Sequence, residues 1–478
     1  MERFTQPGTS GRRPPSNGNA MATQPSEERG AWSGKLGFVL AAAGSAIGLG
    51  NIWRFPYMAS EGGGGAFVFV YLLCVLGIGV PVLFAELAIG RATERNPVGA
   101  FKKLAPGSWW PALGGMGVLA GFGILAFYSV IAGWTVGYFW MAVTGRFGPG
   151  IDAAASGELF TNFIGSAGPA LTLSAFFLGL TAIVVRGGVS GGIEKASKIL
   201  MPVLLGVLFV LLIRAITLPG GMDGVRYLLS PDLSELTPQV AVLALGQALF
   251  SMSLGMGAMI TYGSYFPKSE SLPFAGTAVA LADMFIALLA GLIIFPALFA
   301  AGMEASGGPG LVFVVLPTVF AQMPLGGFFA ILFFASLSIA ALTSTISLME
   351  VVVAYFVDER GWPRKKAATA IAAACFVLAV PSALSQGAVE WLTEMPVFGE
   401  TFLDVQNILW GNYGLSIGAI LITLFVGFKW GTPKMLEWVE LGGNPMPGRD
   451  FFAFMVKWVC PLAVAVVLVF IAVTGQYF

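Results

Sequence analysis

Long hydrophobic stretches, separated by short polar segments, follow one another along most of the chain. A helix of roughly 17–25 residues crosses the hydrocarbon core of a bilayer, and eleven stretches are long enough. Because each stretch is continuous rather than alternating, the pattern predicts membrane-spanning helices and not a membrane barrel. The stretches lie near residues 36–58, 66–89, 112–144, 170–186, 199–217, 240–262, 274–302, 326–356, 367–385, 402–428 and 452–474.

The composition agrees with an all-α integral membrane protein. Hydrophobic residues make up 56% of the 478 residues and charged residues only 10%, whereas soluble domains carry about 25% charged residues. The 25 Lys and Arg residues balance the 25 Asp and Glu residues, so no net charge favours nucleic acid as a partner. The chain has no histidine, and its three cysteines lie within apolar runs, so the usual metal ligands and the usual base of a catalytic triad are missing.

The distribution of polar and basic residues predicts three regions and an orientation. Residues 1–32 are rich in Pro, Ser, Gly, Asn and Arg, and we expect them to form a disordered cytoplasmic tail. Residues 33–430 then hold helices one to ten, and residues 431–478 a loop and helix eleven. Of the 25 Lys and Arg residues, 21 lie on the side of the tail. Because basic residues accumulate on the cytoplasmic side, the amino terminus is predicted to be cytoplasmic and Phe478 external.

Two predicted spans carry helix breakers in their middle. The first contains Gly44, Gly48 and Gly50, and the sixth contains Gly255 and Gly257 after two serines. A glycine inside a helix costs about 1 kcal/mol relative to alanine, and close helix packing is one reason to keep it. Two such breaks five spans apart favour unwound segments instead, which is the arrangement of a transporter's substrate site. Unwound turns offer amides to a carboxylate and carbonyls to a cation.

Polar groups within other spans fit a cation site. Asp283 lies deep in the seventh span and Glu86 late in the second, where a carboxylate is costly and points to function. Asp283 could also be a neutral acid bonded to backbone, and Glu86 a protonated strut for the broken backbone; Glu350 has no evident role. Oxygen ligands without thiolate or imidazole suit alkali ions, and one acid among neutral oxygens suggests a monovalent cation such as sodium.

The motifs around both breaks resemble those of the neurotransmitter:sodium symporter family, in its bacterial amino-acid transporter branch. The resemblance implies eleven helices with an inverted repeat of spans 1–5 and 6–10, in which helices 1 and 6 are discontinuous. It covers the chain from about Trp32 to the end of the tenth span. The matching segments are residues 44–57, 62–67, 133–134, 247–255 and 341–344.

The same resemblance implies two sodium sites and one substrate site. Sodium site 1 would use the Ala46 carbonyl, Asn51, Ser251, Asp283 and the substrate carboxylate. Sodium site 2 would use carbonyls of Gly44, Ile47 and Ala340 with the hydroxyls of Thr343 and Ser344. The carboxylate of the substrate would bind the amides of Leu49 and Gly50 and the Tyr128 hydroxyl. The ammonium of the substrate would bind the carbonyls of Ala46, Phe250 and Ser251 and the Ser253 hydroxyl. The side-chain pocket would be lined by Ile124, Tyr128, Phe250, Met256, Ser344 and Leu348.

Three departures from the family pattern refine this expectation. Gly48 replaces the aspartate of monoamine carriers, so the substrate must bring its own carboxylate. Asp283 replaces an asparagine next to the positions that hold chloride in animal members, here Tyr71, Gln247 and Ser251, so its charge is expected to replace the anion. The outer gate would pair Arg54 with Asp404, because Asn407 stands at the aligned position.

An inner gate is also implied by the resemblance. It would pair Arg29 with Asp358 beside Trp32 and Tyr265. For such pairs near the ends of spans, a solvated charge worth about 0–1 kcal/mol is the alternative explanation.

These observations together predict a sodium-coupled symporter of neutral hydrophobic or aromatic amino acids that works by alternating access, independently of chloride, in the bacterial inner membrane. Proton coupling, or a channel or sensor on the same fold, are the alternatives. The motif Gly188-Val189-Ser190-Gly191-Gly192 resembles a serine-nucleophile turn but lacks a histidine base, so we expect no enzyme. Beyond the lipid bilayer and the substrate, no obligate partner is evident, and the preferred amino acid, ion stoichiometry, proton antiport and oligomeric state stay open.

Overall fold

The computed structural model describes residues 30–148, 150–303, 308–395, 399–443, 445–475 and 477. All regular elements of these residues are helices. The predicted tail up to residue 29, including the proposed gate residue Arg29, lies outside the described residues. Trp32, the last residue assigned to that tail, is only 3% exposed and packs against Tyr262 and Tyr265. The packed part of the chain therefore includes Trp32.

The first half of the chain builds five predicted stretches and the short helices between them. The first stretch comprises α1 (Lys35–Ala46), the π-helical η1 (Gly50–Arg54) and α2 (Phe55–Glu61). The second is α3 (Gly65–Cys74), η2 (Val75–Gly79) and α4 (Val80–Thr93), which continue one another. The remaining elements are α5 (Pro97–Leu104), α6 (Pro111–Val143), α7 (Ala153–Ile164), α8 (Ala167–Arg186), η3 (Val189–Glu194), α9 (Lys195–Ile216), α10 (Gly221–Leu229) and η4 (Leu233–Glu235).

The second half begins with a helix pair separated by six residues, α11 (Pro238–Ser251) and α12 (Ala258–Gly263). The long helices α13 (Leu272–Ala300), α15 (Gly326–Arg360) and α16 (Arg364–Leu384) follow, with η5 (Gly308–Leu311), α14 (Val315–Gln322) and α17 (Glu390–Thr393) between or after them. The chain ends with α18 (Phe402–Gln406), η6 (Asn407–Gly414), α19 (Leu415–Leu424), η7 (Phe425–Trp430), α20 (Thr432–Glu440), α21 (Arg449–Phe454), η8 (Met455–Val459) and α22 (Cys460–Thr474).

Nine helices of the described residues are long and apolar enough to cross a membrane, and ten if the bent pair Lys35–Ala46 and Gly50–Glu61 is one span. The predicted sixth stretch is divided into α11 and α12, so neither part reaches that length alone. The fifth span begins at Val189 rather than near residue 199. It starts earlier because the buried Glu194 carboxylate is satisfied by Lys198 and by Ser33, which lets the helix continue through charged residues. Of the glycines in the motif of residues 188–192, Gly191 and Gly192 lie within η3.

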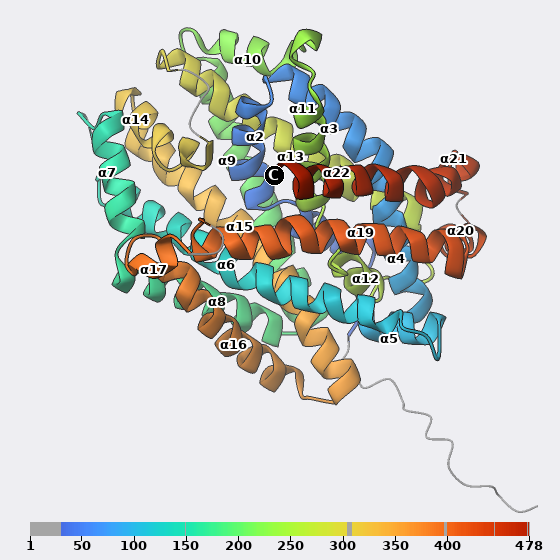
Figure 1. The fold of residues 1–478 in the computed structure, drawn as a ribbon. Helices are drawn as coiled ribbons and strands as arrows, with labels where there is room; N and C mark the ends of the chain where they lie inside the picture. The colour runs from blue at the N-terminus through green and yellow to red at the C-terminus, as the bar shows by residue number, and fades with distance from the viewer. Residues whose placement is uncertain are drawn as a thin grey trace, which may run out of the picture.

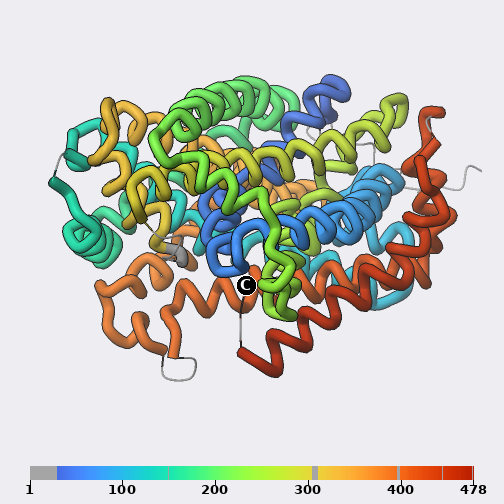
Figure 2. Tube along the Cα trace, turned by 90° about the horizontal axis from the view of Figure 1, so that it is seen from above, coloured from blue at the N-terminus to red at the C-terminus, as the bar shows by residue number. Residues whose placement is uncertain are grey.

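The interrupted helices lie at the centre of the bundle (Figure 1). α1 packs against α9, α13 and α15, α11 against α3, and α12 against α4. The two longest helices, α6 and α15, pack along each other, and α8 and α16 cover them from outside. Seen from above, α22 lies at the edge of the bundle, where it packs on α19 (Figure 2). Each break is therefore packed against other helices of the bundle.

Candidate functional site

The first helix break lies between α1 and η1, where the chain bends by 47°. The Ile47 amide closes α1 by donating to the Ala43 carbonyl, and Ile47 itself is extended. Gly48 follows, and its amide donates to the Asn51 side-chain oxygen at 3.1 Å. A Cβ atom at Gly48 would stand 2.1 Å from the Ser344 hydroxyl oxygen and 2.9 Å from the Tyr128 hydroxyl. The packing around the break thus leaves no space for a side chain at residue 48.

The second break spans residues 252–257, between α11 and α12. Ser253, Gly255 and Gly257 have positive φ angles of 55°, 87° and 77°, a conformation that glycine adopts without cost but other residues rarely do. The Gly255 amide, freed by the break, donates to a Glu86 carboxyl oxygen at 2.7 Å. Glu86 is fully buried in α4. Its carboxyl group therefore contacts the unwound backbone at the place where a strut was expected.

A buried oxygen cluster joins the two breaks at the predicted sodium site 1. The Asp283 carboxylate of α13 accepts hydrogen bonds from the Ser251 hydroxyl at 2.6 and 2.7 Å and from the Asn51 amide at 2.8 Å. The Tyr71 hydroxyl lies 3.4 Å from its second oxygen. All four side chains are at most 2% exposed. One carboxylate among neutral oxygens is a donor set that suits a monovalent cation.

The residues predicted for sodium site 2 meet where α15 passes the end of α1. The Thr343 hydroxyl lies 2.9 Å from the Ala340 carbonyl oxygen and 3.3 Å from the Ile47 carbonyl oxygen. A Cβ at Gly44 would touch the Thr343 side chain at 3.4 Å, so the α1 backbone passes close to α15 here. Ser344 is directed elsewhere, because its hydroxyl donates to the Ser45 carbonyl at 3.3 Å. The structure thus brings the Thr343 hydroxyl together with two of the three expected carbonyls, those of Ile47 and Ala340, with Ser344 on the adjoining cavity wall.

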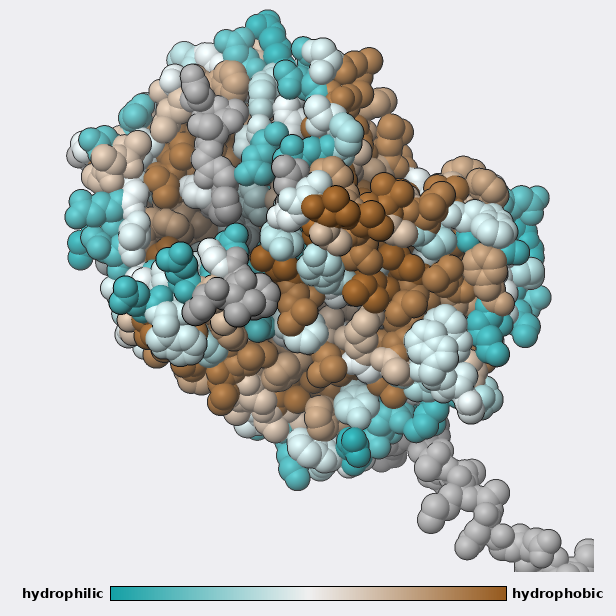
Figure 3. Space-filling model, viewed as in Figure 1, coloured by the Kyte–Doolittle hydropathy of each residue, from teal (hydrophilic) through white to brown (hydrophobic). Residues whose placement is uncertain are grey.

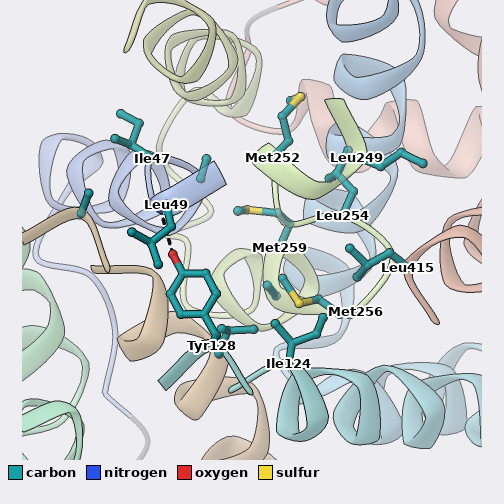
Figure 4. Packing of buried hydrophobic residues seen from close by; sticks show 14 of the residues in the cluster. Ile47, Leu49, Ile124, Tyr128, Leu249, Met252, Leu254, Met256, Met259 and Leu415 are labelled. Atoms are coloured by element: carbon teal, nitrogen blue, oxygen red, sulfur yellow. Dashed lines mark hydrogen bonds between the residues drawn. The ribbon is translucent and has the colours of Figure 1, made fainter. Parts of the chain in front are cut away.

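A small cavity of about 30 Å³ lies between the two breaks, well below the about 300–1,000 Å³ of small-molecule sites, so side chains nearly fill it in this conformation. Figure 4 shows Ile124, Tyr128 and Met256 grouped there, with the Tyr128 hydroxyl directed at the Leu49 amide, which donates to it at 2.9 Å. Of the predicted substrate residues, all except Leu49 line the cavity. The lining residues are Ser45, Ala46, Gly48, Gly50, Ile124, Tyr128, Phe250, Ser251, Ser253, Met256, Ser344, Leu348 and Leu415.

Sequence reasoning missed two wall residues, Ser45 and Leu415. Ser45 lies inside the first glycine motif, and its buried hydroxyl oxygen makes no hydrogen bond. Leu415 begins α19, and the Leu415 carbonyl lies so close to the second break that a Cβ at Gly255 would stand 2.2 Å from it. No local signal marks Leu415, because a leucine in an apolar helix is the commonest residue of a span. None of the lining residues is charged, so the walls are apolar apart from hydroxyl and backbone groups.

The arginine predicted for the outer gate is buried among polar and aromatic side chains. Arg54 is 3% exposed, donates to the Gln247 side-chain oxygen at 2.8 Å and lies 4.6 Å from the centre of the Phe250 ring. Gln247 in turn donates to the Gly50 carbonyl at 2.7 Å. Asp404 forms no salt bridge with Arg54 in the described residues. It lies in the first turn of α18, where the Thr401 hydroxyl donates to its carboxylate at 2.6 Å. The pairing of Arg54 with Asp404 as an outer gate therefore stays a prediction.

At the predicted inner gate, Trp32 connects the segment before α1 to α12 and to the residues that follow it. Its indole N–H donates to the Tyr262 carbonyl at 3.0 Å, and its amide donates to the Tyr265 carbonyl at 3.3 Å. The Tyr265 hydroxyl donates to Glu350 at 2.8 Å. The proposed partner of Arg29, Asp358, accepts hydrogen bonds from the Asn96 amide at 2.9 Å and from the Asn96 side chain at 3.2 Å.

Glu350, to which the sequence assigned no role, forms a buried salt bridge with Arg364 at the start of α16. Both side chains are less than 8% exposed, and the Arg364 Nε–H also donates to the Val185 carbonyl at 2.9 Å. The cluster therefore links α8, the turn after α12, α15 and α16. An acid inside one span and an arginine at the start of the next were the available sequence signal.

Comparison with known proteins agrees with this architecture. A model of the sodium:neurotransmitter symporter family matches residues 29–149 and 161–477. The chain is 40% identical over 439 residues to YhdH, an uncharacterised sodium-dependent transporter of Bacillus subtilis (strain 168), covering 91% of this chain and 96% of YhdH. An uncharacterised sodium-dependent transporter of Haemophilus influenzae is 35% identical over 418 residues, covering 85% of this chain and 90% of the relative.

A solved structure resembles the whole fold. The crystal structure of MhsT in complex with L-phenylalanine has 43% sequence identity to this chain and a TM-score of 0.84, and the match covers 92% of this chain and 99% of MhsT. The fold and the site define a multi-pass, all-helical membrane transporter. The chain belongs to the sodium:neurotransmitter symporter family. It is thus a sodium-dependent transporter and not an enzyme.

Proposed function

We propose that this chain couples the inward movement of sodium to the uptake of a neutral hydrophobic or aromatic amino acid, independently of chloride. The observation that carries the proposal is the buried cluster of Asn51, Ser251 and Asp283, which joins both helix breaks beside a cavity without charged walls. A cation bound there would contact the same cavity that receives the substrate. The structure of MhsT with L-phenylalanine, which has the same fold, supports an aromatic amino acid as the cargo.

Two sodium ions are proposed as co-transported substrates. The first would be held by Asp283, Asn51, Ser251 and the Ala46 carbonyl, and it would be completed by the carboxylate of the amino acid. The second would be held by Thr343 and Ser344 with the carbonyls of residues 44, 47 and 340. In the present conformation Ser344 would have to turn from Ser45 toward that site. An inside-negative potential adds about 2.3 kcal/mol per charge per 100 mV to the driving force.

The chain's own groups would orient the amino acid. Its carboxylate would accept hydrogen bonds from the Tyr128 hydroxyl and the amides of Leu49 and Gly50. Its ammonium would donate to the carbonyls of Ala46, Phe250 and Ser251 and to the Ser253 hydroxyl. Ile124, Met256 and Leu348 would pack on the side chain. The flexible thioether of Met256 can adapt to several side-chain shapes.

Chloride independence is proposed because Asp283 supplies a fixed negative charge beside Tyr71, Gln247 and Ser251. Gln247 is already engaged with Arg54 and the Gly50 carbonyl. An added anion would meet the Asp283 carboxylate within this buried, hydrogen-bonded group, where like charges repel strongly.

For the topology we propose eleven crossings with an inverted repeat of the first five and the next five, in which α1–η1 and α11–α12 are the discontinuous members. The amino terminus would be cytoplasmic and the carboxyl terminus external in the bacterial inner membrane. The α11–α12 pair and the turn residues of its break together run from Pro238 to Gly263, which is long enough for one crossing.

Alternating access requires that ligands favour one conformation over another, because equal binding to both shifts no equilibrium. Binding of ions and substrate at both breaks would favour the occluded bundle, and Arg54 and Phe250 would cover the outer side while Trp32 and Tyr265 close the inner side. Glu86 would hold the second break in shape throughout the cycle.

Uptake of radiolabelled L-phenylalanine into proteoliposomes tests this function. Accumulation should require an inward sodium gradient, saturate with substrate, and persist when chloride is replaced by gluconate. Replacement of sodium by choline at constant pH should stop it, whereas a carrier driven by protons through Asp283 or Glu86 would continue. Conductance without saturable uptake would instead identify a channel, and sodium-dependent binding without uptake a sensor.

A further inference from the structure

A second hollow lies away from the substrate cavity, as a groove of about 700 Å³ among α5, α6, α15, α16 and η6. Its walls are apolar and aromatic and include Gly115, Phe122, Tyr355, Ile371 and Trp410, and no charged residue lines it. Leu119 on its rim is 58% exposed. Such a space is large enough for a long hydrocarbon chain, and neither ion nor amino-acid binding makes use of it.

The groove extends inward from one end of the bundle. Its wall is formed by the first turns of α6, the last turns of α15 and the first half of α16, which meet at the same end because the helices alternate in direction. Ala374, its deepest residue on α16, is ten residues from the start of that helix, or about 15 Å at 1.5 Å per residue. That is about half of a 30 Å hydrocarbon core, the depth of one leaflet.

Three basic side chains, together with the acidic Glu359, lie on the ends of α5, α15 and α16 that form this part of the groove. The Arg360 guanidinium lies 5.9 Å from the ring of the wall residue Tyr355, and the Lys366 ammonium lies 4.8 Å from the ring of Trp362. Lys102 on α5 is paired with Glu359 at 3.2 Å but is 67% exposed. In Figure 3 hydrophobic side chains cover this face of the bundle, and hydrophilic ones border it near α5 and the turn between α15 and α16. The apolar interior of the groove suits the acyl chain of a phospholipid, and the basic residues at its mouth suit the negatively charged phosphate.

We propose that this groove binds one acyl chain of an anionic phospholipid, with its phosphate among Arg360, Lys366 and Lys102. The leaflet is the one at the α5 end of the bundle. Burial of apolar surface in the groove stabilises the bound acyl chain. Each basic residue near the membrane surface strengthens the binding of an anionic headgroup by about fivefold.

The proposal can be tested with a phosphatidylglycerol that carries a diazirine in one acyl chain, applied to the full-length protein in nanodiscs. After illumination, peptide mass spectrometry should locate adducts in residues 111–122 and 352–374. Gly115→Phe fills the groove without a clash, because a Cβ at Gly115 meets nothing within 4 Å. It should reduce these adducts at least tenfold. Gly206→Phe is the matched control, since Gly206 also has open space on the exposed face of α9, and should leave them unchanged.

The headgroup is tested separately. Arg360→Gln with Lys366→Gln should lower labelling by phosphatidylglycerol roughly 25-fold, since each cation contributes about fivefold, and leave labelling by phosphatidylcholine unchanged. Lys434→Gln, at an exposed residue of α20, is the control. Adducts spread evenly over all spans, or insensitive to Gly115→Phe, would overturn the proposal. A change of particle mass in Gly115→Phe from dimer to monomer would also overturn it, because a second copy would then occupy the groove.

Discussion

Substitution of Gly48 by alanine tests the geometry of the substrate cavity. The added Cβ would stand 2.1 Å from the Ser344 oxygen, 2.9 Å from the Tyr128 hydroxyl and 3.1 Å from the Ser344 Cβ. Contacts under 3.0 Å cannot be kept, so Ser344 or the break must move. Gly48 does not have a positive φ, so the effect is steric and not one of backbone conformation. We expect Gly48→Ala to narrow the cavity and disturb its carboxylate-binding wall.

The magnitude follows from the usual cost of overpacking, about 1–3 kcal/mol. Since 1.4 kcal/mol corresponds to a factor of ten, sodium-dependent affinity for L-phenylalanine should fall about 5- to 150-fold. The assay is equilibrium binding of the labelled amino acid to purified protein in sodium and in choline buffer. Gly115→Ala, at a glycine with open space around it, should bind as the wild type does.

A double-mutant cycle with Ser344→Ala separates the clash from other effects. Removing the Ser344 oxygen eliminates the closest contact, so Gly48→Ala should cost less in the Ser344→Ala background than in the wild type. Strictly additive losses would show that the Ser344 contact is not the cause. Wild-type affinity of Gly48→Ala alone would refute the cavity geometry itself.

Three further predictions concern buried acids. Asp283→Ala should abolish sodium-dependent uptake, while size-exclusion chromatography should still show a folded protein. Near-normal uptake would remove Asp283 from the ion site. Asp283→Asn should make the remaining uptake depend on chloride, measured by replacing chloride with gluconate. Glu86→Ala leaves the Gly255 amide without its acceptor and should cost about 1–3 kcal/mol of stability. Glu86→Gln keeps an acceptor, so its melting temperature should be close to that of the wild type. Equal melting temperatures of the two variants would argue against the strut. Arg364→Met leaves the Glu350 carboxylate unpaired and should cost about 3–5 kcal/mol, and Glu350→Leu in the same chain should restore most of it, measured by thermal unfolding in detergent.

The residues named from the sequence for the substrate cavity largely meet in space. All of them except Leu49 line it, and Leu49 contributes its amide to Tyr128. Their positions were predictable because the motifs around both breaks resemble those of a known family, and the resemblance also implied residues on other spans, such as Tyr128 and Leu348. Leu415 and Ser45 were not predictable in this way, since their role comes only from what packs beside them.

The gates show the limit of this approach. Arg54 was identified, but only the packing of the bundle shows that it donates to Gln247 and lies against the Phe250 ring in this conformation. Likewise Glu350 and Arg364 are 14 residues apart on successive helices, and only the angle between α15 and α16 brings them into contact.

The sequence by itself determined that this is a helical membrane protein of the symporter family, because hydrophobic length and glycine motifs are local properties of the chain. The tertiary structure alone decided the close contact at Gly48, the partners of Arg54 and Glu350, and the apolar groove beside α6. These depend on distances between residues on different helices, which are determined by how side chains of all the neighbouring helices fill space together.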